Sequence, residues 1–337
     1  MAINSNYSCS PKVDLKGGVF NGRGWKAHKS DQLAVRNGST STVKLNAIQE
    51  IGNFTDPFSK MSAPSVAASG LGVCVSHLCS PGVYSKFPEM NSGTYTFKPG
   101  DYVFNTPVII GGKGSSAAEV HFGAGNYNFA QGLIESGKAS VNFASGTAIF
   151  SGAVGVCTSP DMAWNPDNSR DDADFNSHIA NPPDPRHPET KDKIACSKGP
   201  DDDGPLDSTT IAMNGGPALS VFGHARLTSG DAKGGMLFYI ASGAMSINTS
   251  GPKNGQFGDA VTLNGNSKFN NIAIWDNATA SSGPALLGAS RKGSSYSFGG
   301  VYIPNQKTII SQKGILQAAF MVLDSIKVLG KGTLSIG

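Results

Sequence analysis

The sequence has little charge. Only 15% of its 337 residues are Asp, Glu, Lys or Arg, against about 25% in an ordinary globular domain. The formal net charge is +3, and no basic run is longer than two residues. Nucleic acids and anionic membranes are bound mainly through clustered basic side chains. We therefore expect neither of them as a partner.

Long apolar runs are also lacking. The longest, at 318–323, is far shorter than the roughly 18–20 residues that span a bilayer. Residues 1–6 show neither the charged nor the apolar region of a signal peptide. We expect no membrane insertion by this chain. We favour the mature ectodomain of a secreted or cell-surface protein, with the export segment absent, over a cytosolic protein.

Helical patterning is missing too, because no window keeps an apolar period of 3.6 residues over three turns. Instead the chain is rich in glycine, with 43 Gly and 19 Pro. Composition therefore predicts an all-β fold.

One short pattern occurs three times at constant internal spacing. Its copies are Phe97, Gly100, Tyr102 and Phe104; Phe122, Gly125, Tyr127 and Phe129; and Phe143, Gly146, Ala148 and Phe150. Repeats of 20–25 residues with strand-like content are typical of a solenoid in which each copy is one turn. We predict a single-stranded right-handed parallel β-helix, or β-solenoid, with a long irregular insertion.

In this fold the aromatic residues of the pattern form an inward core. Alternation places residues two apart on the same face of a strand, so their rings would stack from turn to turn. A carbohydrate-binding aromatic strip is the alternative for the same rings. The glycines would make the corners through positive φ, and we assign Gly100, Gly125, Gly146, Gly243, Gly265 and Gly330 to this role.

Changes in composition divide the chain into five parts. We expect irregular coils or a cap at 1–50, a proline-rich excursion at 51–92 and β-helix coils at 93–157. A Pro- and Asp-rich insertion follows at 158–207, and coils resume at 208–337. Trp164 in the insertion and Trp275 near the second set of coils are predicted to be exposed anchors.

The five cysteines permit two disulfides. Cys74 and Cys79 are close enough for a local bridge, and Cys157 with Cys196 would close the insertion. An odd count leaves one thiol over, most simply Cys9. Five reduced cysteines in a cytosolic protein are the alternative.

The insertion also contains the best candidates for a metal site. Its clustered carboxylates could hold a calcium ion, although they lack the ligand spacing of an EF-hand; the candidates are Asp171, Asp172, Asp174, Asp201 and Asp203. A solvated acidic loop without a metal is the alternative. Apart from calcium, the sequence predicts no cofactor, and it shows no catalytic motif.

Several Gly-rich motifs resemble one known family. They are Asp56-Pro57-Phe58 with Ala63-Pro64, Pro81-Gly82-Val83-Tyr84, Pro99-Gly100-Asp101-Tyr102, residues 299–304 (GGVYIP) and residues 329–334 (LGKGTL). The chain is similar in these to the C-terminal region of TadG-like proteins of the bacterial tight-adherence (Flp) pilus system. The insertion at 158–207 departs from the family pattern, and so does the absence of an N-terminal membrane helix.

The resemblance implies a structural protein of the bacterial exterior and no catalytic residues. We therefore expect a noncatalytic β-helix protein that contacts pilus components, a cell surface or a matrix polysaccharide. The alternative is a polysaccharide-active lyase or glycoside hydrolase that uses the insertion carboxylates, because β-helices commonly host such enzymes.

Overall fold

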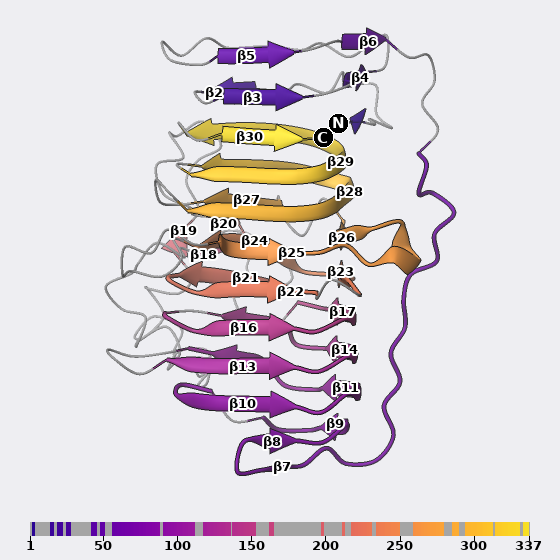
Figure 1. Ribbon diagram of the computed structural model, residues 1–337, viewed down its shortest axis with the longest axis vertical. Coiled ribbons are helices and arrows are strands. Elements are labelled where there is room, and N and C mark those ends of the chain that lie inside the picture. Colours follow the sequence, from indigo (N-terminus) through magenta and orange to yellow (C-terminus); the bar gives the residue numbers. More distant parts are fainter. Residues whose placement is uncertain are drawn as a thin grey trace.

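The described part of the chain is mostly β-structure, and most of its strands belong to one large, mostly parallel sheet (Figure 1). The computed structural model describes residues 56–87, 90–111, 117–135, 137–152, 217–230, 234–249, 259–279, 285–289, 294–312, 314–330 and 333–336. It also describes the backbone of residues 2–3, 14–16, 19–22, 25–27, 42–45, 48–50, 162–164, 197–198 and 211–212. The only helical segment among the described residues is the single turn η1 (Ser267–Phe269).

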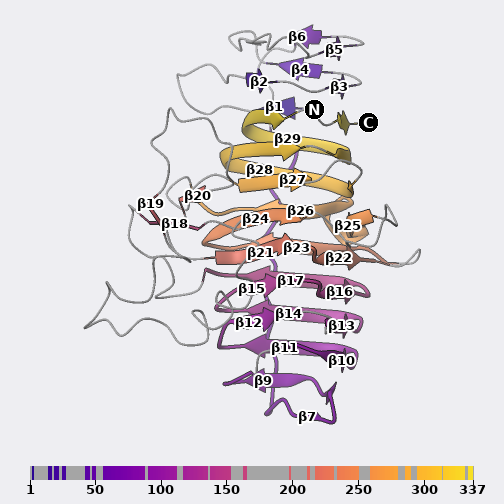
Figure 2. The ribbon, with the colours of Figure 1, turned by 90° about the vertical axis from the view of Figure 1, so that its left-hand side faces the viewer.

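Each strand in the middle of the chain pairs in parallel with the strand one repeat further on, which sorts the strands into three series. The first series contains β8 (Leu78–Cys79), β10 (Gly93–Phe97), β13 (Ala118–Phe122), β16 (Ser140–Phe143), β22 (Arg226–Ser229) and β25 (Asp259–Leu263). The second contains β9 (Gly82–Tyr84), β11 (Gly100–Phe104), β14 (Gly125–Phe129), β17 (Gly146–Phe150), β23 (Met236–Ile240) and β26 (Ile272–Asp276). The third contains β12 (Val108–Ile110), β15 (Leu133–Glu135), β21 (Pro217–Gly223), β24 (Ala244–Thr249) and β27 (Ala285–Ala289). One strand from each series makes a layer, and the layers are stacked along the long axis of the molecule (Figures 1 and 2).

Two long strands continue all three series. β28 (Ser295–Gln312) pairs in turn with β25, β26 and β27, and β29 (Ile315–Gly330) pairs with β28 along nearly its whole length. The N-terminal strands then extend the stack beyond β29 and β30 (Thr333–Ile336). They are β1 (Ala2–Ile3), β2 (Asp14–Lys16), β3 (Val19–Gly22), β4 (Trp25–Ala27), β5 (Thr42–Leu45) and β6 (Ile48–Glu50). The two ends of the chain therefore meet in the upper part of the stack in Figure 1.

The three copies of the sequence pattern lie in register. Gly100 pairs with Gly125 and Gly125 with Gly146, and the Phe residues four positions later pair in the same way. The rings of Phe104 and Phe129 stack with centroids 5.0 Å apart, and those of Phe129 and Phe150 with centroids 5.1 Å apart. Parallel in-register pairing thus places identical rings directly above one another.

A second column of rings stands beside the first. Phe97, Phe122 and Phe143 stack with centroid distances of 4.5 and 4.4 Å. The predicted core residues Phe97, Tyr102, Phe104, Phe122, Tyr127, Phe129, Phe143 and Phe150 are all at most 1% exposed, and all belong to one core cluster. This cluster extends from Cys79 to Ile336, so the same interior continues through the stack.

The corners between the series are closed by hydrogen bonds from one layer to the next. After each strand of the second series, the next amide donates to the last carbonyl of the layer below. Asn105, Ala130, Ser151, Ala241 and Asn277 donate to Tyr84, Phe104, Phe129, Phe150 and Ile240. Backbone groups that leave the sheet at a bend would otherwise be buried without a partner. The ladder therefore continues around this corner.

The corner glycines serve two purposes. Gly100, Gly146 and Gly243 have φ values of 145°, 127° and 83°, which disfavour side chains. Gly125 and Gly265 do not adopt such angles, so positive φ is the wrong explanation for them. A Cβ atom at Gly125 would lie 1.9 Å from the carbonyl oxygen of Gly100, and one at Gly265 would lie 1.7 Å from that of Asn271. Close approach of the neighbouring layer requires glycine at position 125, and close approach of the backbone within the β25–β26 corner requires it at position 265. Gly330 is the last residue of β29.

The predicted excursion at 51–92 is wrong for its second half. β8 and β9 belong to the first and second series, so paired strands begin before residue 93. Pro81 lies between the two strands rather than inside one, and its missing N–H breaks no ladder bond there. β7 (Cys74–Val75) pairs antiparallel with β8 and forms the last strand at the lower end of Figure 1.

The first half of the same region runs along the outside of the stack, and we call residues 56–70 the strap. It follows the second series from the β28 and β29 level down to β9 (Figure 1). Phe58 packs edge-on against Tyr302 at 5.1 Å and stacks on Phe320 at 5.8 Å. The hydroxyl of Tyr302 donates to Oδ2 of Asp56 over 2.5 Å, and Oδ1 of Asp56 accepts from the amide of Phe58. The strap is thus held mainly by side chains.

Trp275 lies beneath this region, and its predicted role as an exposed anchor is wrong. The side chain is only 5% exposed and belongs to a second apolar cluster on the outer side of the second series. Phe58, Met61 and Val66 of the strap pack against that cluster. Trp275 is buried because the strap covers it, and no sequence pattern near Trp275 predicts the strap.

Candidate binding face

The three series differ in what lies against their outer sides. In the second series the strap packs against part of the outer surface. In the third series the outward positions Ile134, Ser220, Ser246 and Leu286 are at most 2% exposed. A small antiparallel sheet of β18 (Met162–Trp164), β19 (Ser197–Lys198) and β20 (Ile211–Ala212) lies beside this series (Figure 2). Among the described residues, only those of the first series form an outer side that is largely open to solvent.

We call that open side the ladder face. Its members alternate with inward core residues and are exposed or half-buried. They are Thr94, Thr96, Glu119, His121, Ser140, Asn142, Arg226, Thr228, Thr262, Ser295, Ser297, Ile315, Gln317 and Ser335. They come from β10, β13, β16, β22, β25, β28, β29 and β30, at the front of Figure 1.

The spacing of the ladder face follows from its backbone. Neighbouring layers are about 4.8 Å apart, and outward residues on one strand are about 6.6 Å apart. The face is therefore a regular grid of side chains, with one row per layer. A ligand that repeats along its own length could contact several rows at once.

The chemistry of the ladder face is mostly neutral. Hydroxyl and amide groups predominate, and the side chains already bond to one another in places. Nδ2 of Asn142 donates to Oγ1 of Thr228 over 2.8 Å, across the β16–β22 pair. Nε2 of His121 lies 3.2 Å from Oε1 of Glu119, and this is the one contact between a basic and an acidic side chain found in the described residues. Such a surface offers donors and acceptors rather than a field of one sign.

Two carboxyl groups of the described residues lie inside the stack. Glu135 is fully buried and faces the core, in register with Ile110 and Val221. Neither of its oxygens has a hydrogen-bond partner. Burial raises the pKa of Glu135 well above its usual range. The backbone amides of Arg226 and Val141 oppose this rise more weakly, and neither makes a regular hydrogen bond to the carboxyl group.

Asp276 is the second buried carboxyl. Its Oδ1 accepts from the amide of Ala278 over 3.0 Å, and its Oδ2 accepts from the side chain of Gln306. Burial raises the pKa of Asp276 to about 7, and these two hydrogen bonds limit the rise. Both carboxyls face inward, away from the ladder face, and we assign them to the stack's stability.

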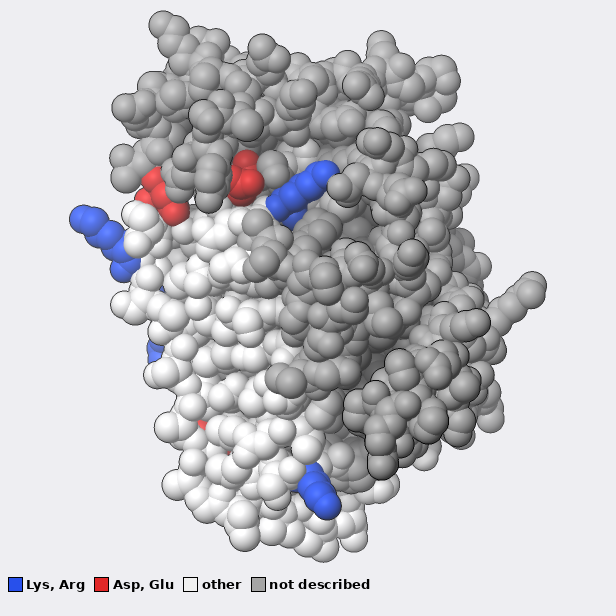
Figure 3. Space-filling view, turned by 180° about the vertical axis from the view of Figure 1, so that it is seen from behind, with Lys and Arg blue, Asp and Glu red and all other residues white. Residues whose placement is uncertain are grey.

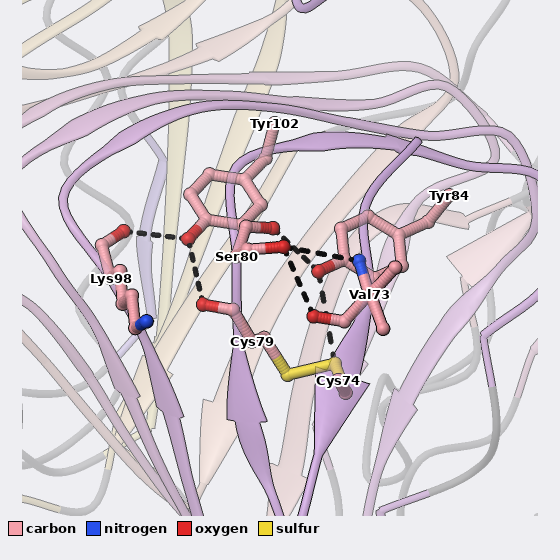
Figure 4. The surroundings of a disulfide bond; sticks show 7 residues. All are labelled: Val73, Cys74, Cys79, Ser80, Tyr84, Lys98 and Tyr102. Carbon is pink, nitrogen blue, oxygen red and sulfur yellow. Dashed lines mark hydrogen bonds between the residues drawn. A yellow bond between two sulfur atoms is a disulfide. The ribbon is translucent and has the colours of Figure 1, made fainter. Parts of the chain in front are cut away.

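The disulfide of the structure lies at the lower end of the stack. Cys74 and Cys79 are bonded across the β7–β8 hairpin, as the sequence predicted for this pair. The hydroxyl of Tyr84 donates to the carbonyl of Ser80, and that of Tyr102 donates to the carbonyl of Lys98, both over 2.6 Å (Figure 4). Tyr127 repeats the arrangement with Gly123 at 2.5 Å.

This repeated tyrosine bond ties β9, β11 and β14 of the second series to the corner before each of them. Burial raises the pKa of Tyr102 and of Tyr127 far above their usual value. Both phenols therefore keep the proton that the bond requires. In the third copy Ala148 replaces the tyrosine, and Phe238 of the next layer stacks on Phe150 at 5.7 Å.

The remaining predicted sites lie outside the described residues. These are the Cys157–Cys196 bridge, Cys9 and the calcium candidates Asp171, Asp172, Asp174, Asp201 and Asp203. Within the described residues, no group of three or more His, Cys, Asp or Glu side chains is placed to hold a metal ion. No helical segment there has the length and apolar character needed to cross a membrane.

The ladder face was not predicted from the sequence. Its only signal is the alternation of small polar residues with core residues, as in Thr94 to Phe97, which looks the same in any half-buried strand. Comparison with known proteins adds no further information, since no family model, curated protein or solved structure matches the chain. The resemblance to TadG-like proteins stays a prediction.

Proposed function

We propose that the chain is a right-handed parallel β-helix of the bacterial cell exterior that works by binding rather than by catalysis. Its role would be contact with pilus components, a cell surface or a matrix polysaccharide, as the resemblance to TadG-like proteins implies. The observation that carries the proposal is the ladder face, an open grid of neutral polar side chains on a stack of strands in register.

The β-helix part of the proposal is supported by the period of three strands. In a β-helix each turn contributes one strand to each side and contacts only its neighbours. The pairings of β10 with β13, β11 with β14 and β12 with β15 follow this rule, and the corner hydrogen bonds continue it.

The location is supported by the disulfide. Disulfides persist in oxidising compartments and are rare in the bacterial cytosol. The Cys74–Cys79 bond closes the terminal hairpin of the stack and therefore favours an exported protein.

A neutral polymer suits the ladder face better than a charged one. Its charged members, Glu119 on β13 and Arg226 on β22, lie on two strands among hydroxyl and amide groups. Each sugar hydroxyl would make one weak hydrogen bond to the face. Because the sugars of one polymer chain are linked, binding of the first sugar holds the next ones close to the face, and the overall affinity rises. We therefore propose a neutral polysaccharide as the preferred ligand.

The test is binding to insoluble polysaccharides, with Thr96→Asp/Gln317→Asp as the variant. Both residues are exposed on the ladder face, so new charges there should weaken binding by at least about tenfold, equivalent to 1.4 kcal/mol. Ser65→Asp, at an exposed position of the strap, is the matched control and should bind as the native protein does.

The same incubations separate binding from catalysis. Release of reducing ends or unsaturated sugars, abolished by Asp172→Asn, would establish the polysaccharide-active enzyme instead. Native binding that survives Thr96→Asp/Gln317→Asp would refute the ladder face as the site.

A further inference from the structure

The lower end of the stack is apolar and exposed. Four of the five exposed large apolar side chains in the described residues lie within eight positions there. They are Leu71, Val73, Val75 and Leu78, with 80, 54, 67 and 45% of their surface exposed. We call residues 70–79 the β7 end (Figures 1 and 2). Clustered apolar exposure of this kind marks an interaction site more often than scattered single residues do.

The β7 end is also free of charge. Residues 61–85 contain no Asp, Glu, Lys or Arg. In Figure 3 one basic side chain is visible near the lower end of the described surface, and the surface around it is uncharged. Edge strands of monomeric proteins are usually protected by charged side chains, above all lysine, because bare edges pair with other chains. This end lacks that protection.

The backbone of β7 has an unused edge. The Cα atoms of Cys74 and Cys79 are 4.0 Å apart, which is the short spacing of a non-hydrogen-bonded antiparallel pair. In such a pair the N–H and C=O groups point away from the partner strand, so those of Cys74 point to the outer edge. Beside them residues 70–72 form the last layer of the second series, where Gly72 donates to the carbonyl of Val83.

The two ends of this sequence lie far from the β7 end. β1 and β30 both pair with β29. From β8 to β29 the first series makes seven pairings, or roughly 34 Å at about 4.8 Å each. A segment extending from either end would begin at the opposite part of the stack. A second molecule is the better-placed occupant.

We propose that this molecule is a second copy of the chain, joined through a two-fold axis at the β7 end. A strand pairs antiparallel with its own copy only across such an axis. Two uncharged edges do not repel each other, and their apolar side chains would be buried together. The dimer would be a rod of twice the length, with the β29 and N-terminal strand regions pointing outward at both ends.

The test is the oligomeric state of the oxidised chain in solution. We expect a dimer by light scattering and sedimentation at concentrations up to about 100 µM, a range that detects even modest affinity. Leu71→Lys/Val75→Lys should lower the association constant by about 100-fold or more, because it sets like charges opposite one another. Ile315→Lys, at the remaining exposed large apolar residue, is the matched control and should leave the dimer intact.

Hydrogen exchange gives a second readout that needs no variant. The Cys74 amide should exchange more slowly as concentration rises, while amides of the ladder face should not change. A native protein that stays monomeric overturns the proposal. So does open-ended polymerisation, which indicates a head-to-tail contact, or a dimer that persists in Leu71→Lys/Val75→Lys.

Discussion

Replacement of Gly125 by alanine tests the close stacking of layers most directly. The new Cβ atom would lie 1.9 Å from the carbonyl oxygen of Gly100, whereas real contacts are at least 3.0 Å. The layers must therefore separate locally by about 1.1 Å (3.0 − 1.9). The amide of Gly100 now donates to the carbonyl of Ala124 over 3.0 Å, and this separation would break that bond.

The expected loss of stability follows from the broken bond. Gly100 is half-buried and Ala124 is exposed, so loss of this hydrogen bond costs only about 0.5–1.5 kcal/mol. Forcing the two layers apart adds about 1–3 kcal/mol, and we expect Gly125→Ala to lower the free energy of unfolding by about 2–4 kcal/mol. Gly70→Ala is the matched control, because φ is +78° there but no atom lies within 4 Å of the added Cβ. Its cost should be only about 1–2 kcal/mol of left-handed backbone strain.

The measurement is equilibrium unfolding in urea, followed by circular dichroism. Both variants replace glycine by alanine, so the effect on the unfolded chain cancels between them. If Gly125→Ala costs no more than Gly70→Ala, close packing of the layers does not require glycine at position 125.

Three further predictions concern the disulfide, a buried carboxyl and the strap. Replacing Cys74 and Cys79 by serine removes the bond that closes a loop with a sequence separation of five, and it should lower the free energy of unfolding by about 2 kcal/mol. Hydrogen exchange should become faster only at the lower end of the stack. An unchanged urea midpoint would contradict this. The pKa of Asp276 is raised to about 7 in the folded protein, so the folded protein holds this proton more tightly than the unfolded chain does. The contribution of Asp276 to the free energy of unfolding should therefore fall by about 4 kcal/mol as the pH rises from about 4 to 7, and it should not change further above pH 7. Asp276→Asn should remove that component in denaturation at successive pH values, and an identical pH slope in both proteins would refute it. Phe58→Ala should lower stability by about 1–3 kcal/mol and speed proteolysis of the strap, since the ring packs on Tyr302 and Phe320; resistance equal to the native protein would show that the strap does not depend on it.

The sequence predicted more of the core than of the surface. The spacing from Gly100 to Phe104 and its copies identifies both the strands and their inward residues, because alternation and register follow from local geometry. The Cys74–Cys79 bond was also predictable from the sequence, since a separation of five residues suits a hairpin. By contrast, Trp275 looked like an exposed anchor, because burial of its outer side depends on a segment about 200 residues earlier in the chain.

By itself, the sequence determined the all-β class and the repeat with its in-register pairing, and it offered the hairpin disulfide as one of two candidate bridges. These depend on period, glycine and short separations, which are properties of neighbouring residues. Tertiary structure alone decided that the N-terminal strands pair beyond β29 and that the strap packs on the second series. It also decided that the ladder face and the β7 end stay open. The physical reason is that such contacts join residues far apart in sequence, and no local pattern records which surface will cover which.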